Sequence, residues 1–475
     1  MMKGALVIFL TLISQVSFVK CYEGEKYETL RKFLLPESLN RSNNYIIDED
    51  SAHQYSPVYI GPQEGFKAAN KIIALPGEPK GVKFDQYSGY VTVDPTVGRA
   101  LFYYISESEN PSSKPLVLWL NQGLGCSSLG VGAMSGQGPF RVSKDNKTLW
   151  HNEYAWNKVA NILYLKSPAA AGFSYSNTSS DYTIGDKQTA KDSYTFLINW
   201  LERFSDYKSR DFYIAEEAYA GFFVPELAYL ILHNNKITNQ TVINLKSIQM
   251  GNAIVDTETQ SKGLYDFLRS HSPISDEIYH GLVSNCTCNK YAEQAVKAMG
   301  NINRYNIYAP VCSSTSNAPW IYGEDPCADD YALSYLNNPE LDLWVTGARL
   351  VNQINKPSSS LNESSSNELS SYSIDLTALP TIRELMAGGI NVWMYSGDTN
   401  SFIPVTATWY AIKKLGVAVK APWYSQGEVA GFVVEYENLT FVTLKGAGLF
   451  APSYKPARSL AMFSSFLEGK LLSSS

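Results

Sequence analysis

The five histidines are the side chains from which metal binding or proton transfer near neutral pH would start. They are scattered along the chain, at His53, His151, His233, His271 and His280. No two are three or four residues apart and none belongs to a mixed pattern with cysteine, the spacings that bring two ligands to one metal ion. The sequence therefore predicts no metal site and no cofactor, and histidine spacing alone indicates no catalytic group.

A carboxylate that follows a buried strand is a stronger candidate for chemistry. Asp398 lies in Ser396-Gly-Asp-Thr399, directly after an apolar run that ends at Tyr395. In hydrolases that use a nucleophile, a base and an acid, the acid lies at such a strand end. A hydrogen-bonded loop aspartate has the same pattern, so Asp398 indicates catalysis only if a base lies beside it.

Short apolar runs that end in a turn predict the strands that must position such a group, at 116–120, 162–165, 212–214, 392–395 and 441–444. Continuous runs of this length are typical of strands buried on both faces. Apolar residues at helical spacing lie between these strands, for example from Tyr194 to Phe204. The alternation predicts an α/β fold with a mostly parallel central sheet and helices on both faces.

The same alternation divides the chain into parts. We assign the core to 72–255 and 380–475, where strands and helices alternate. The alternation lapses over 256–379, which we interpret as an inserted cap with a serine-rich loop over 357–374. Residues 22–71 show no sustained period and predict an N-terminal arm or a propeptide-like segment.

The N-terminal residues predict that the protein enters the secretory pathway. An apolar run from Ala5 to Val19 follows Lys3, and this layout is typical of a signal peptide over 1–21. A buried N-terminal helix is the weaker alternative, because polar residues follow the run. Acceptor sequences for N-linked glycans, which matter only in the secretory pathway, occur at Asn40, Asn146, Asn177, Asn239, Asn285, Asn362 and Asn438.

Composition excludes several classes of protein and partner. The chain has 475 residues, 45% hydrophobic and 18% charged, which excludes disordered, collagenous and coiled-coil proteins. A net charge of -6 without a long basic run argues against nucleic-acid binding. No second apolar stretch reaches the length of a membrane span, so we expect no membrane anchor in the mature chain. Composition does not indicate the oligomeric state.

Several long motifs carry a resemblance to a known family, and they occur in unbroken order from about Ile72 to Leu460. They are Gln86-Tyr-Ser-Gly-Tyr90, Lys114-Pro-Leu-Val-Leu-Trp-Leu-Asn121, Gly172-Phe-Ser-Tyr175, Tyr219-Ala-Gly221 with Val224-Pro225, and Tyr395-Ser-Gly-Asp-Thr399. In these motifs the chain resembles the plant-type serine carboxypeptidases and serine carboxypeptidase-like proteins. The resemblance implies the α/β-hydrolase fold with a helical insertion. It also implies release of C-terminal amino acids at acid pH, or acyl transfer from glucose esters, so the implied substrate is a peptide C-terminus or a small acyl compound.

The catalytic motifs of that family are altered in this chain. The family's G-E-S-Y-A-G reads Glu216-Glu-Ala-Tyr-Ala-Gly221, which puts Ala218 at the nucleophile position. The family's G-A-G-H reads Gly446-Ala-Gly-Leu449, which puts Leu449 at the histidine position. Asp398 matches the triad acid. Since a methyl group cannot attack a carbonyl and leucine accepts no proton, we expect no serine acyl-enzyme.

The resemblance also implies a partly altered substrate site. Backbone N–H groups of Gly123 and Tyr219 would form the oxyanion hole. Asn121 and Glu217 match the residues that hold the substrate's terminal carboxylate. The other two members of that site are replaced, by Gln122 and by Gly136 in Gly136-Gln-Gly-Pro139. We further expect Glu216, at a family glycine, to crowd the turn that holds Ala218.

Cysteine pairing follows from the same resemblance. The chain has six cysteines, of which Cys21 belongs to the predicted signal peptide. Cys312 and Cys327 should form a disulfide within the cap, whereas Cys126 lacks the partner that the family has near Ser358. Cys286 and Cys288 are too close in sequence for an unstrained mutual disulfide and could be free or paired elsewhere.

The favoured hypothesis is a secreted or vacuolar pseudoenzyme that binds peptides, acyl glycosides or another protein. The alternative is an active carboxypeptidase or acyltransferase of the same family that uses unrecognised residues. A third hypothesis is a degenerate copy with no stable product. The candidate replacement nucleophiles, Ser127, Ser128, Ser174 and Ser176, lie in motifs where serine is ordinary and have no base beside them in sequence.

Overall fold

The computed structural model describes the chain from residue 58 to residue 472 with gaps. The described residues are 58–121, 128–169, 172–178, 181, 183–284, 288–312, 325–338, 371–373, 376–416, 422–425 and 428–472. The predicted signal peptide and most of both the N-terminal arm and the serine-rich loop lie outside this set. The glycan acceptors Asn40, Asn285 and Asn362 lie outside it too, as do Gly123, Cys21, Cys126 and Cys286.

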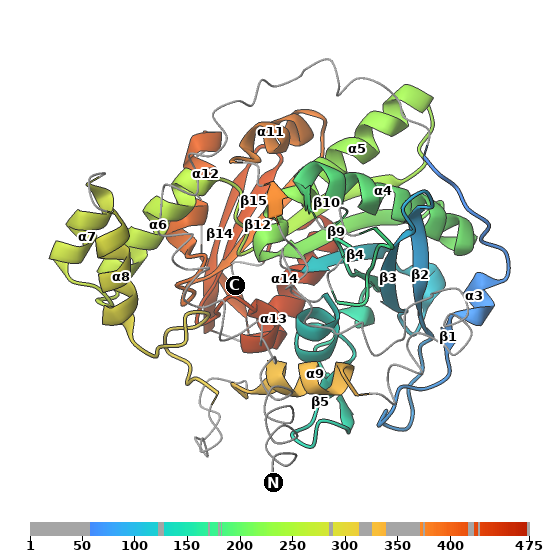
Figure 1. The fold of residues 1–475 in the computed structure, drawn as a ribbon, viewed down its shortest axis with the longest axis horizontal. Helices are drawn as coiled ribbons and strands as arrows, with labels where there is room; N and C mark the ends of the chain where they lie inside the picture. The colour runs from blue at the N-terminus through green and yellow to red at the C-terminus, as the bar shows by residue number, and fades with distance from the viewer. Residues whose placement is uncertain are drawn as a thin grey trace, which may run out of the picture.

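A large central sheet dominates the described residues (Figure 1). Its strand order is β1-β2-β3-β7-β4-β9-β10-β12-β15-β14-β13. Every neighbouring pair from β7 to β15 is parallel, and the strands outside this centre pair antiparallel. The strands are β1 (Lys71–Ile72), β2 (Gln86–Asp94), β3 (Arg99–Ser106), β4 (Leu116–Asn121), β7 (Asn161–Leu165), β9 (Asp211–Glu217), β10 (Asn244–Gly251), β12 (Asn391–Gly397), β13 (Pro422–Ser425), β14 (Glu428–Tyr436) and β15 (Leu439–Leu444).

Two small ribbons stand apart from this sheet. β5 (Phe140–Val142) pairs antiparallel with β6 (Leu149–His151), and β8 (Thr183–Gly185) pairs parallel with β11 (Ser371–Ser373). The predicted mostly parallel centre is therefore confirmed, and each predicted strand lies in a strand of the sheet. The antiparallel strands at the two sides were not predicted, nor was β10.

Helices cover both faces of the sheet, as predicted. Figure 1 shows α4 (Asp186–Arg203), α5 (Phe223–Thr238) and α11 (Leu379–Ala387) on one side, and α13 (Ala451–Tyr454) and α14 (Pro456–Glu468) on the other. α14 packs through aromatic rings, with Phe466 edge-on to both Tyr213 of β9 and Trp393 of β12. The remaining short elements are α3 (Phe66–Ala69), η4 (Pro111–Ser113), η6 (Trp156–Lys158), η8 (Ser205–Tyr207) and the π-helical η5 (Ser128–Ser135).

The described residues between the neighbouring strands β10 and β12 are mainly helical. It contains α6 (Thr257–Ser270), α7 (Asp276–Val283), α8 (Cys288–Met299) and α9 (Ala328–Leu336), and α12 (Val405–Leu415) packs against α6. Asp256 caps α6 by accepting a bond from the Thr259 amide, and Ser275 caps α7. α6, α7 and α8 share a separate apolar core of Leu264, Tyr265, Leu268, Ile274, Leu282, Ala292, Ala295 and Met299. α9 lies apart from this bundle, against η5 and β5.

Candidate active site

The turn after the central strand β9 has a strained backbone. β9 ends at Glu217, and Ala218 begins the short helix η9 (Ala218–Gly221) with φ 70°. This left-handed conformation is uncommon for a residue other than glycine. Its carbonyl accepts a bond of 3.0 Å from the amide of Ile254, which follows the neighbouring strand. A sharp strand-to-helix turn of this kind is how α/β-hydrolases present a nucleophile.

Close packing behind this turn accounts for the glycine at its end. A Cβ atom added to Gly221 would lie 2.5 Å from the Ile254 carbonyl oxygen, so no side chain fits there. The turn also keeps its conformation with Glu216 in place. The expected crowding by Glu216 is therefore not visible in the backbone at Ala218.

Asp398 lies at the end of β12, close to the loop that follows β15. Its Oδ1 accepts a bond of 2.6 Å from the Gly446 amide. Burial raises the pKa of Asp398 above its ordinary value, against the opposing effects of that amide and of Lys445 and Lys455. The carboxyl group is thus held between two strand ends, where the acid of a triad would lie.

Leu449 lies in the same loop and is fully buried, with 0% of its surface exposed. Its amide donates to the Tyr305 carbonyl over 2.7 Å. Its carbonyl accepts a bond of 2.6 Å from Nδ2 of Asn252. The residue at the family's histidine position is therefore packed as a core residue, tied by its backbone to two other segments.

Asn252 is a positioning residue that sequence reasoning missed. It follows β10 with φ 43° and is fully buried. Its Oδ1 accepts a bond of 3.0 Å from the Gly397 amide, while its Nδ2 donates to Leu449. One amide side chain thus joins the loops after β10, β12 and β15. The sequence signal for this residue was an asparagine directly after Gly251, the last residue of β10, because asparagine tolerates a positive φ.

Two adjacent glutamates end β9, and they point to opposite faces of the sheet because side chains alternate along a strand. Glu217 is 1% exposed, and its Oε1 accepts a bond of 3.3 Å from the Tyr395 hydroxyl. Glu216 is 0% exposed, and within the described part of the chain neither of its oxygens has a hydrogen-bond partner. Burial raises the pKa of both carboxyl groups well above the ordinary value, and the Glu217 charge raises that of Glu216 further.

The other site residues are placed only in part. The backbone of Asn121 at the end of β4 is in register with Glu217 at the end of β9, so the two implied carboxylate-binding residues end neighbouring strands. Tyr219 is buried in η9, and its hydroxyl donates to Asp186 over 3.4 Å. Gly123, Gln122 and the side chain of Asn121 lie outside what the structure describes.

The candidate replacement groups are engaged elsewhere. Ser174 Oγ donates to the Lys166 carbonyl over 2.6 Å, and Ser176 Oγ donates to Asp181 over 2.7 Å. Ser128 is buried in η5, and Ser127 lies outside the described residues. The described histidines each contact a neighbouring aromatic ring, in the pairs His151 with Phe140, His233 with Tyr229, His271 with Phe267 and His280 with Tyr279. No replacement pair of nucleophile and base is assembled among them.

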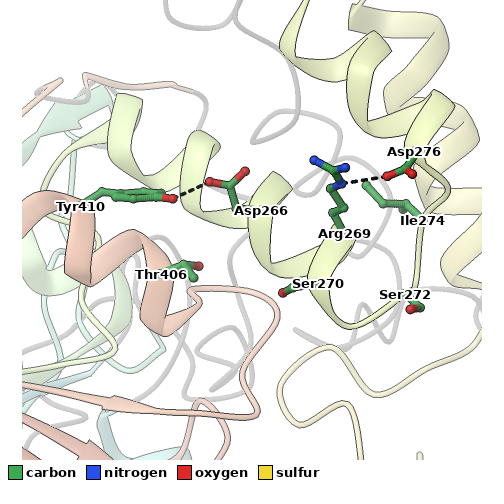
Figure 2. A pocket seen from close by; sticks show the side chains of 8 residues that line it. All are labelled: Asp266, Arg269, Ser270, Ser272, Ile274, Asp276, Thr406 and Tyr410. Carbon is green, nitrogen blue, oxygen red and sulfur yellow. Dashed lines mark hydrogen bonds and ion pairs between the residues drawn. The ribbon is translucent and has the colours of Figure 1, made fainter.

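A polar hollow lies elsewhere, between α6, the start of α7 and α12. Its volume is about 670 Å³, and Figure 2 shows Arg269 facing Asp276 and Tyr410 facing Asp266. Arg269 Nε contacts Asp276 at 2.8 Å, and the Tyr410 hydroxyl donates to Asp266 over 2.5 Å. These contacts hold α6 to α7 and α12, so the hollow is structural in character.

Cys312 and Cys327 form the disulfide that the resemblance implied, with 4.9 Å between their Cα atoms. Cys288 begins α8. Within the described ranges, no group of three or more histidine, cysteine, aspartate or glutamate side chains is placed to hold a metal ion. None of the helices in those ranges has the length and apolar character needed to cross a membrane.

Fold and site together define the class: a parallel sheet between helical layers, with a strained turn after its central strand, is the α/β-hydrolase fold. Comparison with known proteins agrees. The prohormone-processing carboxypeptidase Kex1 of Saccharomyces cerevisiae superposes with a TM-score of 0.70 at 20% identity, covering 85% of this chain and 96% of that one. At this identity the likeness establishes the fold alone.

Sequence comparison gives the family. Residues 76–469 match the serine carboxypeptidase family, peptidase S10. Serine carboxypeptidase-like 40 of Arabidopsis thaliana is 45% identical over 431 residues, which are 85% of this chain and 84% of that protein. Serine carboxypeptidase 24 of the same plant is 42% identical over 440 residues, covering 85% of this chain and 93% of that protein. The chain belongs to the serine carboxypeptidase family.

Proposed function

We propose that this chain is a serine carboxypeptidase-like protein of the secretory pathway that does not hydrolyse peptides and acts as a binding protein. The observation that carries the proposal is the pair Ala218 and Leu449. Ala218 occupies the strained turn after β9, and Leu449 is fully buried beside the Asp398 loop. Loss of the nucleophile or the base alone costs about as much as loss of a whole triad, on the order of 10⁶ in turnover.

The proposed ligand is the C-terminus of a peptide or of another protein, or a small acyl compound. Support comes from the strand end where Asn121 and Glu217 lie in register. Glu217 is held there by Tyr395, and its raised pKa makes it an acid that can donate a hydrogen bond at low pH. A site without a nucleophile can therefore still bind a ligand.

An active enzyme of the same family remains the competing candidate. It is favoured by one observation, that the turn at Ala218 keeps the conformation of a nucleophile elbow. Such an enzyme, carboxypeptidase or acyltransferase, would use a residue that neither motif identifies.

A direct test separates the two. The purified, folded protein is exposed to a fluorophosphonate probe and to blocked dipeptides near pH 5. We expect no labelling and no turnover, because Ala218 carries no hydroxyl group. Turnover that survives repurification, and that an Asp398→Ala variant abolishes, would establish the active enzyme. Protein that cannot be obtained folded from any host would instead indicate a degenerate copy.

Glycan occupancy tests whether the protein enters the secretory pathway. Asn177, Asn239 and Asn438 are exposed, but Nδ2 of Asn438 donates to the Met386 carbonyl over 2.9 Å, and Oδ1 of Asn146 is buried. After expression in a eukaryotic cell, we expect glycans at Asn177 and Asn239 with higher occupancy than at Asn146 and Asn438. Endoglycosidase treatment followed by peptide mapping measures this. An unglycosylated product in the cytosol would contradict the secretory assignment.

A further inference from the structure

The described part of the N-terminal arm, 58–70, lies against α4 as a strap. Asn199 of α4 is 0% exposed, and its side chain bonds the backbone of this strap at two points. Its Oδ1 accepts a bond of 2.8 Å from the Gly61 amide, and its Nδ2 donates to the Tyr59 carbonyl over 2.7 Å. The same Oδ1 accepts a bond of 3.2 Å from the Gln63 side chain. One buried side chain of the helix thus pairs with three groups of the strap.

Arg203, one turn further along α4, holds the second half of the strap. This arginine is 7% exposed. Its Nε donates to Gln63 Oε1 over 2.9 Å, and its Nη1 donates to Asn70 Oδ1 over 2.8 Å. The Phe66 ring lies 4.9 Å from the guanidinium carbon, which is a cation–π contact. Because a buried charge is costly unless it is hydrogen-bonded, these partners make the strap part of the environment that Arg203 requires.

The strap continues directly into the central sheet. Asn70 Oδ1 accepts a bond of 2.9 Å from the Tyr103 hydroxyl of β3, and the Asn70 carbonyl accepts a bond of 3.0 Å from the Ser88 amide of β2. Gly89 leaves room for this side chain, since a Cβ atom there would lie 2.6 Å from Asn70 Oδ1. β1 begins at the next residue, Lys71, and pairs with β2. The junction between the strap and the sheet is therefore packed and hydrogen-bonded.

The backbone of the strap is hydrogen-bonded along its length. In and beside α3, the amides of Phe66, Ala69 and Asn70 donate to carbonyl groups of the strap itself. The bonds of Tyr59 and Gly61 to Asn199 fix the part before α3. Proteases cut preferentially at exposed segments whose backbone is free of such bonds. Cleavage inside the strap would therefore require the strap to leave α4 first.

We propose that the strap is a permanent part of the mature protein, and that proteolytic processing of the N-terminal arm stops before residue 58. The sequence left open whether 22–71 is an arm or a propeptide-like segment, and the contacts of the strap favour an arm for 58–70. This inference concerns maturation of the chain and does not depend on the ligand of the proposed binding function.

Limited digestion of the full chain with trypsin tests how firmly the strap is held. Lys67 lies in α3, within the strap, whereas Lys80 is exposed in a turn after β1. We expect cleavage after Lys80 to be at least about tenfold faster than cleavage after Lys67, because the second cut needs local opening of the strap. Peptide mapping by mass spectrometry over the time of digestion measures both rates.

Variants of the contact residues identify what holds the strap. Asn199→Leu keeps a similar side-chain volume but loses the bonds to Tyr59 and Gly61. It should speed cleavage after Lys67 at least about tenfold, since each lost bond changes the opening equilibrium by roughly two- to tenfold. Asn234→Leu is the matched control: Asn234 of α5 donates to the carbonyl four residues earlier, as Asn199 does, and should be cut like the wild type. Asn70→Ala, a change in the strap itself, serves if Asn199→Leu fails to fold.

N-terminal sequencing of the protein purified from a eukaryotic cell gives the processing limit directly. We expect the first residue to lie no later than residue 58. A mature N-terminus within or beyond the strap would overturn the proposal, as would cleavage of the wild type after Lys67 as fast as after Lys80. If Asn199→Leu and Asn70→Ala are both cut as slowly as the wild type, these contacts do not hold the strap and the proposal is wrong.

Discussion

Ala218 has the backbone conformation that exposes the nucleophile in α/β-hydrolases. A positive φ in a residue with a Cβ atom costs on the order of 1 kcal/mol or more. The surrounding strands impose it through the bond from the Ile254 amide and the tight approach at Gly221. The turn is therefore a property of the fold, and it persists whether or not residue 218 can react.

Restoring the missing side chains tests how much of the site remains. We expect the double variant Ala218→Ser and Leu449→His to hydrolyse blocked dipeptides at least about 10²-fold more slowly than an active relative, because a misplacement of about 1 Å has that cost. The new imidazole must fit into a volume that the buried Leu449 side chain now fills. In addition, Asp398 Oδ1 already accepts a hydrogen bond from the Gly446 amide. Steady-state kinetics at pH 5 measures the difference.

Controls refine this repair experiment. Each single variant should be inactive, since nucleophile and base act as a unit. Adding Glu216→Gly and Gln122→Gly should raise turnover in steps, whereas Gly136→Glu should not help, because backbone oxygens occupy the space of its Cβ. A double variant as fast as an active relative would mean that only two side chains separate this protein from a carboxypeptidase.

At the scale of elements, sequence pattern identified five strands of the central sheet and missed others, including β3, although Ala100 to Ile105 form an apolar run. The runs in β4, β7, β9, β12 and β15 were predicted because parallel strands are buried on both faces. β10 carries Lys246 and Gln249, and β2 buries Gln86 and Ser88, so neither reads as an apolar run. Hydrogen bonds to neighbouring strands satisfy the backbone groups of β2 and β10, and no local sequence pattern indicates this pairing.

The residues of the candidate site also fall into those that the sequence predicted and those that it missed. The resemblance to the family's motifs predicted the positions of Ala218, Asp398 and Leu449. Asn252 escaped, because its role depends on contacts between segments far apart in the chain: its Nδ2 donates to the Leu449 carbonyl, and its Oδ1 accepts from the Gly397 amide. Such contacts leave no spacing that one sequence could show.

Asn252 provides the prediction at this scale, because it ties three loops together. Asn252→Ala should lower the free energy of unfolding by about 2 to 4 kcal/mol, since it leaves the buried Gly397 amide and Leu449 carbonyl unpaired. Urea unfolding at pH 5 measures this. Asn252→Gly is the matched control, because glycine adopts φ 43° without strain but makes neither bond. A glycine variant as stable as the wild type would show that backbone conformation, and not the two bonds, is what Asn252 supplies.

At the scale of the whole molecule, buried acids couple folding to pH. Burial raises the pKa of Glu216, Glu217 and Asp329 above their values in the unfolded chain. Between the unfolded and folded values the native state binds more protons, so the free energy of unfolding falls as pH rises, by up to about 1.4 kcal/mol per pH unit for each group. Asp94 has a lowered pKa, and its contribution is instead lost as pH falls below its unfolded value.

The sign of these shifts predicts a protein that is most stable in mildly acidic solution and loses stability toward neutral pH. Glu216 should contribute most clearly, since both of its oxygens are buried and lack partners in the described part of the chain. Glu216→Met replaces it by an apolar side chain beside Met250, its register partner on β10. This variant should flatten the fall in thermal unfolding temperature between pH 5 and pH 7.5 and raise stability at the higher pH. The exposed Glu64, changed to glutamine, is the control and should leave the profile unaltered. If Glu216→Met loses stability with pH as steeply as the wild type, Glu216 is not the proton-linked group, and the dependence must come from the other buried acids, Glu217 and Asp329.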